Sequence, residues 1–457
     1  MWWRRAVVGF ACLVAFGCGD DDGGVDAGRD AAVADTGRDV APDVGEDAAL
    51  DDVGADVGDA DRGPVNVLFP RTGISAAELG VVVNEDDPQS VAVAARYVEA
   101  RGIPEATVVR VSFPVQDEIS LEVFEPIRTA VAALPGEVQG LAVTWTRPYR
   151  VDCMSVTSAL AFGFNERFCS PADGSCEDTA ASPLFASDLT RPFDDFRVRP
   201  AMMLAGVSEE EALALIDRGL AADGTLPEGK GYLVRTSDFE HARRWPTFVE
   251  QPDRWTGLAL TYVDNSPGGG SDVISGKTDL MFYFTGLTRI PELDSNTYAP
   301  GSVIDNYRSV GTPEDGVTLS ALRMLEAGAT GSYGTVGPCP FQNSSPNLIR
   351  FLEVYFRGAT LLQAYWSSVN WPGEGLFVGD PLARPFERQL ATVDGDMVVL
   401  ETNAVLPGDT GWVVQEGPSA DGPWTVLTLV EAEAYERQTI RVPRPAEGWL
   451  RLTRGRD

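Results

Sequence analysis

The stretch LGVVVNEDDPQSVAVAARYVEARGIPEATVVRVSF, Leu79 to Phe113, decides the fold of this chain. It opens with an apolar run that suits a buried strand and continues through a polar turn. A helix is predicted from Pro88, a residue suited to a first helical turn, to Arg101, with Gly102 ending it. The apolar run that follows predicts a second strand, and a strand–helix–strand unit of this length pairs its strands in parallel.

The same alternation recurs down the chain. Further strands are predicted at GLAVTW, GYLVRTS, LMFYFTG, ATGSYGTV and GLFVGD, and further helices at 123–134, 208–219, 319–327 and 347–356. An α/β fold with a parallel sheet layered by helices is therefore the predicted class. Ligands of such open sheets usually bind beyond the carboxyl ends of the strands.

After Glu387 the apolar period changes to two. Short alternating runs such as MVVLETN, TGWVVQEG and QTIRVP are separated by Gly, Pro and Asp, with no helical pattern between them. We expect an α/β domain at 65–387 and a small β-sandwich of immunoglobulin or fibronectin type III style at 388–457.

The first 18 residues are typical of an export signal. Arg4 and Arg5 precede an apolar run from Ala6 to Phe16, which is too short to span a membrane as a mature helix. Gly17 and Cys18 resemble a bacterial lipoprotein cleavage box, and an ordinary signal peptide cut nearby is the alternative. The resemblance implies lipidation of Cys18, and Gly19, which carries no inner-membrane retention signal, favours the outer membrane or the cell surface.

The segment 19–64 is predicted to be a disordered acidic linker. From Gly19 to Gly63 it holds fifteen Asp or Glu against three Arg and has no aromatic residue. Such a composition cannot bury enough apolar surface to offset its ordering entropy. The whole chain carries a formal charge of -32, which argues against a nucleic-acid partner.

The order of these pieces resembles the gingipain type of caspase-like cysteine peptidase, followed by an immunoglobulin-like domain. The segments that carry the resemblance are GLAVTWTRPYR, RPAMMLAGVSEEEALALIDRGL, MFYFTGL, GATGSYGTV and GLFVGDPLARPF. The segments VVVNEDDPQSVAVA, YFTGL, AGATGSYGTV, AYWSSV and GDPLARPF more closely resemble an uncharacterised family of exported bacterial proteins. That closer resemblance implies export but no particular activity.

In the peptidases a catalytic histidine follows one strand and the nucleophilic cysteine ends the next. The resemblance assigns Leu287 to the histidine position and Asp305 to Tyr307 to the cysteine position, so the catalytic pair is expected to be absent. The chain's one histidine, His241, is predicted to lie on an exposed helix face capped by Ser237. Without a base in hydrogen-bond reach, a thiol is weakly activated.

Four cysteines remain once the signal and anchor are removed, an even set for an oxidising compartment. Cys169 and Cys176 enclose a short turn and are the expected first disulfide, and Cys153 and Cys339 are the expected second. Cys339 is thereby expected to be part of a structural disulfide, with a nucleophilic role as the alternative.

Polar residues follow several predicted strands, and strand ends that share one edge would form a crevice. The candidate binding residues are Asn84, Asp86, Arg147, Thr285, Gly286, Gly334, Thr335 and Asp380. Helix caps and turns explain such residues equally well. The cofactor stays open: Asp86, Asp87 and Asp380 would suit calcium or magnesium, but no ligand spacing indicates a metal site. Tyr365, Trp366 and Trp371 offer a sugar-stacking platform, although helical spacing favours core packing.

These observations favour a lipid-anchored envelope protein that binds or scaffolds an envelope protein or polysaccharide. The alternative is a hydrolase or cysteine peptidase with rearranged catalytic residues, in which Cys339 or Asp305 acts at the edge of the crevice. A purely structural role is the third reading, and a crevice filled with side chains would favour it.

Cys18 gives a direct test of the anchor. Substituting Cys18→Ser is expected to release the protein from the membrane fraction, because the acylated thiol is lost. Globomycin is expected to leave an unprocessed precursor. Unchanged processing and unchanged fractionation would contradict lipidation.

Overall fold

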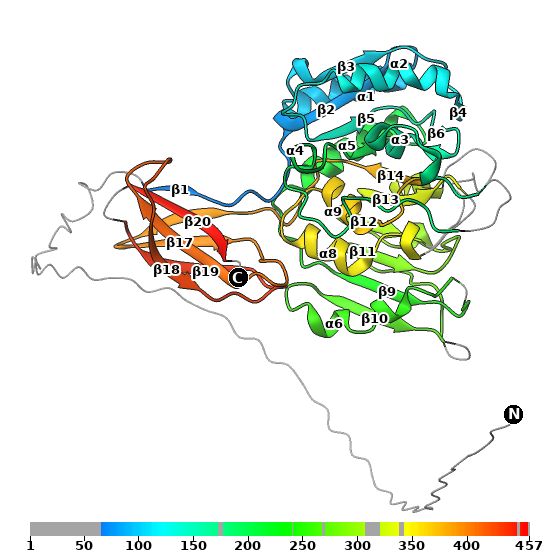
Figure 1. The fold of residues 1–457 in the computed structure, drawn as a ribbon. Coiled ribbons are helices and arrows are strands. Elements are labelled where there is room, and N and C mark those ends of the chain that lie inside the picture. The colour runs from blue at the N-terminus through cyan, green and yellow to red at the C-terminus, as the bar shows by residue number, and fades with distance from the viewer. Residues whose placement is uncertain are drawn as a thin grey trace, which may run out of the picture. The chain divides into compact units, whose positions relative to one another are not determined.

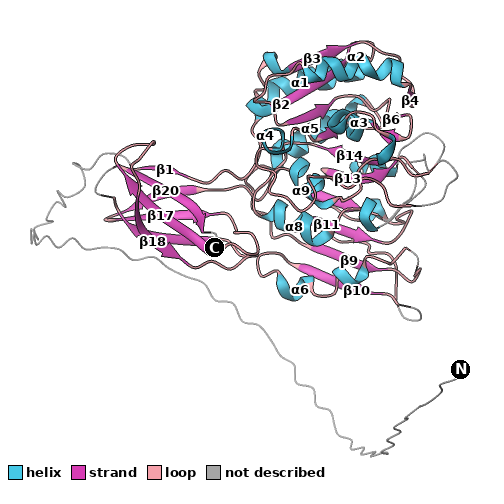
Figure 2. Ribbon diagram, viewed as in Figure 1, coloured by secondary structure: helices cyan, strands magenta, loops and turns pink. Residues whose placement is uncertain are grey.

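The computed structural model describes residues 65–171, 177–239, 241–266, 270–306, 320–337, 342–445 and 448–455. Within these residues, one large sheet has helices packed against it, and smaller sheets accompany it (Figures 1 and 2). Cys18, the acidic linker, Cys176 and Cys339 lie outside the described residues. Among the helices of this part, none combines the length and apolar composition needed to cross a membrane.

In the described residues, ten strands form the large sheet. In spatial order they are β10 (Leu260–Asp264), β9 (Gly231–Arg235), β11 (Leu280–Thr285), β12 (Tyr298–Asp305), β13 (Gly331–Thr335), β14 (Gly375–Gly379), β8 (Ala201–Met203), β5 (Gly140–Val143), β2 (Leu79–Asn84) and β3 (Val108–Val111). Neighbours pair in parallel from β10 to β13 and from β8 to β3, and β13 pairs antiparallel with β14. The predicted parallel sheet layered by helices is confirmed.

The helices fall between these strands, as the alternating pattern predicts. They are α1 (Pro88–Arg101), α2 (Leu121–Ala132), α3 (Val156–Phe162), α4 (Pro192–Phe196), α5 (Glu209–Ala222), α6 (Gln251–Arg254), α7 (Ser320–Glu326), α8 (Leu348–Phe356) and α9 (Leu361–Ser368).

Helix α1 shows why the opening stretch folds as it does. The Asp87 carboxylate accepts a hydrogen bond from the Gln89 backbone amide at 3.0 Å and caps the first turn. Gly102 ends the helix at φ +64°, a left-handed conformation that glycine adopts without strain. The flanking strands β2 and β3 pair in parallel, with Val81 opposite Val108.

The core of the sheet is apolar and aromatic. All six residues of β11 are buried. Tyr365 and Trp366 on α9 are completely buried as well, and the Trp366 ring stacks on Phe377 with centroids 4.2 Å apart. Core packing is therefore the role of these two side chains, as their helical spacing favours, and the sugar-stacking alternative is wrong for them.

The C-terminal residues form two small sheets that share one core. The first contains β1 (Asn66–Leu68), β20 (Trp449–Gly455), β17 (Gly411–Gly417) and β18 (Thr425–Val430), and the second contains β15 (Leu390–Asp394), β16 (Met397–Thr402) and β19 (Gln438–Pro443). Alternate residues such as Leu400, Val414 and Leu452 point into the shared core, which confirms the period-two prediction. A third small sheet joins β4 (Glu118–Ile119), β6 (Arg150–Val151) and β7 (Met154–Ser155).

Strand β1 departs from the expected domain limits. It pairs in parallel with β20, so residues 66–68 belong to a sandwich sheet and not to the α/β part. Three residues are too short a pattern to reveal a partner strand at the other end of the chain.

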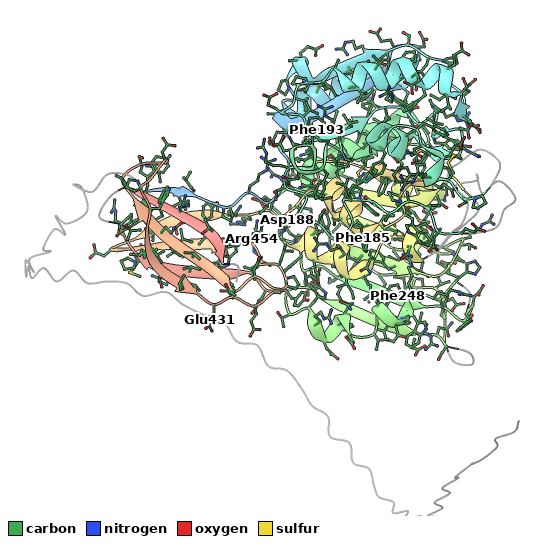
Figure 3. The ribbon with its side chains drawn as sticks, viewed as in Figure 1. Phe185, Asp188, Phe193, Phe248, Glu431 and Arg454 are labelled. Carbon is green, nitrogen blue, oxygen red and sulfur yellow. A yellow bond between two sulfur atoms is a disulfide. The ribbon has the colours of Figure 1, made fainter. Side chains whose placement is uncertain are left out.

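Asp188 is held between two arginines. One carboxylate oxygen accepts a hydrogen bond from Arg357 at 2.7 Å, and the other accepts one from Arg454 on β20 at 2.5 Å (Figure 3). Burial alone would raise the pKa of Asp188, but the two guanidinium groups outweigh burial and hold that pKa well below its ordinary value. The ionised carboxylate is therefore the form that the fold stabilises.

Substituting Asp188→Asn is expected to lower the free energy of unfolding by about 2–4 kcal/mol at pH 7, because the buried Arg357 loses its carboxylate partner and Arg454 keeps, among the described residues, only Asp409, at 3.5 Å. The folded-state pKa lies below the unfolded one, so the loss should be complete above about pH 4 and shrink as the pH falls further. Urea unfolding measures both effects. Asp394→Asn, which breaks an exposed pair with Arg441, is the control and should change little. Equal effects of the two substitutions would contradict the assignment.

Candidate functional site

The carboxyl ends of β11 and β12 lie side by side. Phe284 is the register partner of Asp305, so the turn that follows Thr285 comes next to the end of β12. Gly286 and Leu287 form that turn, and the Leu287 amide donates a hydrogen bond to Thr285 Oγ1 at 3.2 Å. These are the two strand ends to which the peptidase resemblance assigns a histidine and a cysteine.

A buried ion pair occupies this edge of the sheet. Arg244 Nη1 donates to Asp305 Oδ1 at 2.7 Å, and Arg244 Nη2 donates to the Thr285 carbonyl at 3.1 Å. The two side chains are only 7% and 0% exposed. Burial raises the pKa of the Asp305 carboxyl, and Arg244 offsets part of that rise. Because the carboxylate is enclosed, the structure does not support Asp305 as a catalytic residue.

His241 lies close to the same strand ends. A Cβ on Gly286 would stand 2.5 Å from the His241 carbonyl oxygen, so only glycine permits this contact between the two backbones. The imidazole Nδ1 lies 2.6 Å from a carboxylate oxygen of Asp238. The histidine therefore sits beside the end of β11, although it follows β9 in the chain.

The predicted Ser237 cap is wrong. Its hydroxyl donates to Asp272 at 2.6 Å, and the Asp238 carbonyl accepts the Ala242 amide that begins the turn around His241. His241 is partly exposed in a short turn and does not lie on a helix. The sequence around Ser237 does not show which acceptor its hydroxyl bonds to, because charged residues follow it closely in the chain.

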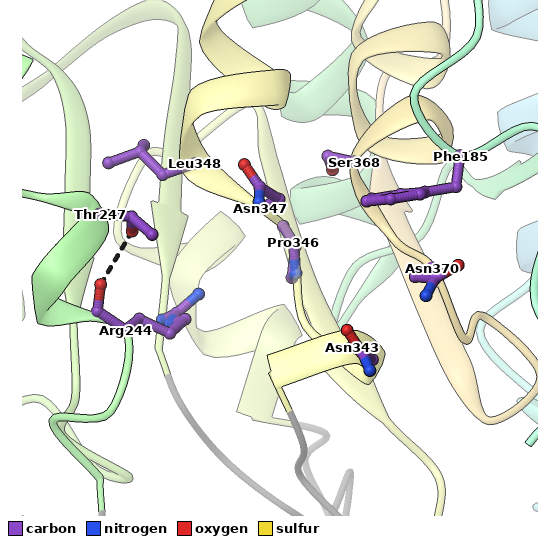
Figure 4. Close-up of a pocket in the computed structure, with 9 residues that line it drawn as sticks. All are labelled: Phe185, Arg244, Thr247, Asn343, Pro346, Asn347, Leu348, Ser368 and Asn370. Atoms are coloured by element: carbon purple, nitrogen blue, oxygen red, sulfur yellow. Dashed lines mark hydrogen bonds between the residues drawn. The ribbon is translucent and has the colours of Figure 1, made fainter. Parts of the chain in front are cut away.

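A cavity of about 140 Å³ opens beside Arg244 (Figure 4). Its apolar wall consists of Phe185, Pro346 and Leu348, and its polar wall consists of Arg244, Thr247, Asn343, Asn347, Ser368 and Asn370. Arg244 and Thr247 lie on one side of this space, and Phe185 and Asn370 lie on the other. The cavity therefore joins three segments, those that follow β9, β13 and α9, with the insert that precedes α4.

The predicted binding residues do not share one crevice. Thr285, Gly286, Gly334 and Thr335 lie at the ends of β11 and β13, which are separated only by β12. Asn84, Asp86 and Arg147 follow β2 and β5. Neighbouring strands are about 4.8 Å apart, so β2, six steps from β11, lies about 29 Å from it across the sheet, and β5, three steps from β13, lies about 14 Å from that strand.

Local contacts account for the positions of Asn84, Asp86 and Arg147. The Asn84 carboxamide donates to the Phe113 carbonyl at 3.0 Å and accepts from the Phe113 amide at 3.2 Å. Asp86 is exposed in the following turn. Arg147 pairs with Asp117 at 3.1 Å. Asn84 therefore ties one strand end to the next, and the prediction that these residues face the ends of β11 and β13 is wrong.

Asp380 lies at the opposite edge of the sheet. Gly379 pairs with Gly331 at the start of β13, because β14 runs antiparallel to β13. The buried carboxylate accepts from Tyr97 at 2.5 Å and pairs with Arg101 at the end of α1. This arrangement is a structural ion pair, and Asp380 is not a crevice residue.

The contact between Asp380 and the end of α1 also shows that the three carboxylates that would suit calcium lie far apart. Asp86 and Asp87 precede α1, whereas Asp380 meets its last residue. A helix of 14 residues at 1.5 Å per residue spans about 20 Å. Among the described residues no group of three or more His, Cys, Asp or Glu is arranged to hold a metal ion.

The disulfide differs from both expected pairings. Cys153, in the turn between β6 and β7, is bonded to Cys169, with Cα atoms 5.7 Å apart. The β6–β7 hairpin brings the two together, since the Asn165 amide lies 3.3 Å from the Met154 sulfur. The Cys169–Cys176 and Cys153–Cys339 bridges are therefore wrong, because each requires a cysteine that is already bonded.

The residues that sequence reasoning missed are Arg244 and the carboxamides around the cavity. Arg244 stands in the run HARRW beside His241, and nothing in that run distinguishes it from Arg243. Asn343, Asn347 and Asn370 precede or follow predicted helices and resemble ordinary caps. That all three line one cavity depends on how α8 and α9 pack.

Comparisons with known proteins give a distant likeness in fold. No family model and no curated protein matches the chain. Two solved structures match, each at 10% identity. One is described as a structure of a protease (TM-score 0.40, covering 85% of this chain and 98% of that one). The other is the Arg-specific cysteine proteinase gingipain R (TM-score 0.36, covering 86% and 99%).

Peptide mapping of the non-reduced protein tests the corrected disulfide. A peptide linking Cys153 to Cys169 is expected, because the hairpin holds the two thiols in bonding distance. Protein made in an oxidising compartment should be used. A linked peptide that joins Cys169 to Cys176, or Cys153 to Cys339, would contradict the pairing.

Proposed function

We propose that this protein is an exported, membrane-anchored binding module whose α/β domain does not carry out the chemistry of a cysteine peptidase. One observation carries the proposal: Leu287 lies in the turn after β11, and β12 ends in Asp305, which is buried in an ion pair with Arg244. The side chains at these positions are a hydrocarbon and an enclosed, compensated carboxylate.

Neither side chain supports acyl transfer. Leu287 cannot accept a proton, and a nucleophile needs a base within hydrogen-bond reach. Asp305 is fully buried, and one of its oxygens is already bonded to Arg244, so it cannot reach a peptide carbonyl. Moving it outward would leave the guanidinium without compensation, which is costly.

The sequence supports export and anchoring. The apolar run before Gly17 and Cys18, followed by an acidic segment without aromatic residues, suits a lipid anchor with a solvated tether. The C-terminal sandwich, of immunoglobulin or fibronectin type III style, would serve as a spacer or adhesion unit. The partner is then an envelope protein or a polysaccharide.

The proposal is tested by incubating the full chain with fluorescent casein and with short peptides that carry arginine or lysine before the cleaved bond. No hydrolysis above buffer is expected, before or after reduction of the protein. The Cys339→Ala variant is the matched control and should behave identically. Hydrolysis that is lost in Cys339→Ala would overturn the proposal.

A second candidate function is a hydrolase that uses His241 and Cys339. The position of His241 beside the Gly286 turn, with its ring bonded to Asp238, favours it. Cys339 follows β13 by four residues and lies outside the described residues. Rapid labelling of Cys339 by iodoacetamide near neutral pH, slowed at least tenfold in His241→Ala, would support this candidate, whereas slow labelling at the rate of a free thiol would reject it.

A further inference from the structure

The carboxamides around the cavity have unused hydrogen-bonding capacity. The main-chain carbonyl of Asn343 accepts from the Trp371 amide, and that of Asn370 accepts from the Ser182 amide, each at 2.7 Å. These bonds fix the two backbones. Neither side-chain amide bonds to any described residue, and each offers two donors and an acceptor.

Asn347 contributes donors to the same space. Its Oδ1 accepts from the Arg350 amide at 3.1 Å and caps α8, which leaves the NH₂ group with no partner in the described part of the chain. Figure 4 shows Asn347 between Arg244 and Asn370. Three neutral carboxamides thus converge on one cavity.

The cavity wall is electrically balanced. Among the described residues that line it, Arg244 is the charged one, and Asp305 directly behind it cancels that charge at 2.7 Å. An anion entering the cavity would lose its hydration without meeting a net positive charge, and the chain as a whole carries -32. A cation would likewise lose its hydration without meeting a net negative charge in the cavity wall. A neutral polar ligand is therefore favoured over either ion.

The apolar wall limits the size and shape of the ligand. The Phe185 ring forms one side, Pro346 lies between it and Arg244, and Leu348 lies near Thr247 (Figure 4). A cavity of about 140 Å³ is close in volume to engineered cavities of about 150 Å³ that hold one benzene ring. It therefore takes one ring-sized group, with an apolar face for Phe185 and polar edges for the carboxamides.

We propose that this cavity binds a single neutral hexose unit of a polysaccharide. Each sugar hydroxyl both donates and accepts, as a carboxamide does, and the C–H face of the ring can lie on Phe185. The inference rests on the proposed binding function and names its ligand class. The hydroxyls would be bound by Asn343, Asn347 and Asn370, and Arg244 would fix the position of the cavity wall.

Saturation-transfer NMR and calorimetry on the full chain test this proposal. The probes are the methyl glycosides of glucose, galactose, mannose and N-acetylglucosamine, with glucuronic acid and glucosamine as charged rings of similar size. At least one neutral glycoside is expected to bind in the millimolar range, and the charged rings should bind at least tenfold more weakly.

Side-chain variants locate the binding. Asn370→Leu and Asn343→Leu should each weaken binding about tenfold, since each removes up to two neutral hydrogen bonds while the main-chain bonds that fix the segment remain. Phe185→Ala should weaken it similarly. Asn66→Leu makes the same change at an exposed site on β1 and should leave binding and the thermal midpoint unchanged.

Absence of binding by all four neutral glycosides would overturn the inference, as would equal binding of the charged rings or unchanged binding in both asparagine variants. These results are separable from failure of the proposed function. If no sugar binds and casein also stays intact, only the ligand class is wrong. Casein hydrolysis that requires Cys339 rejects the binding module itself, whatever the sugars do.

Discussion

The carboxylate of Asp305 is fully buried at the end of β12, and Arg244 is the cation that compensates it. A buried charge without such a partner is strongly unfavourable, so the loop after β9 has to fold back over the ends of β11 and β12. That course brings the His241 backbone against Gly286 and makes Arg244 one wall of the cavity. The geometry of this edge of the sheet follows from one ion pair.

The same pair determines the chemical character of the edge. Because Asp305 and Arg244 neutralise each other, the cavity presents carboxamides and apolar groups without net charge. Asp305 is also withdrawn from solvent, which removes the acidic group that could otherwise act beyond the strand ends. An edge of an α/β sheet that commonly holds ligands is thus suited here to recognise a neutral molecule.

Local pattern predicts the elements of this fold well. The apolar run at Leu79, the cap at Asp87 and the stop at Gly102 specify the first strand and helix, because each depends on residues close by in sequence. The period-two runs after residue 388 specify the sandwich strands for the same reason. Strand β1 escapes prediction because its partner, β20, lies at the far end of the chain.

The candidate site is less predictable because it depends on the order of strands within the sheet. Asn84 and Thr285 each follow a strand, yet five strands separate β2 from β11. Asp380 follows a strand too, but β14 is reversed relative to β13, which takes Asp380 to the opposite edge. The shortest loop between cysteines suggested the wrong disulfide, since a hairpin brought Cys153 to Cys169 instead. Packing, not spacing, decides each of these cases.

A double-mutant cycle on Arg244 and Asp305, followed by urea unfolding of the full chain at pH 7, tests the central claim most directly. Each single substitution, Arg244→Gln or Asp305→Asn, should cost about 3–5 kcal/mol, because it leaves one charge or polar partner buried without compensation. The double variant should be more stable than the sum of the two losses predicts, by about 2 kcal/mol or more. Additive losses would contradict the claim that this ion pair organises the carboxyl edge of the sheet.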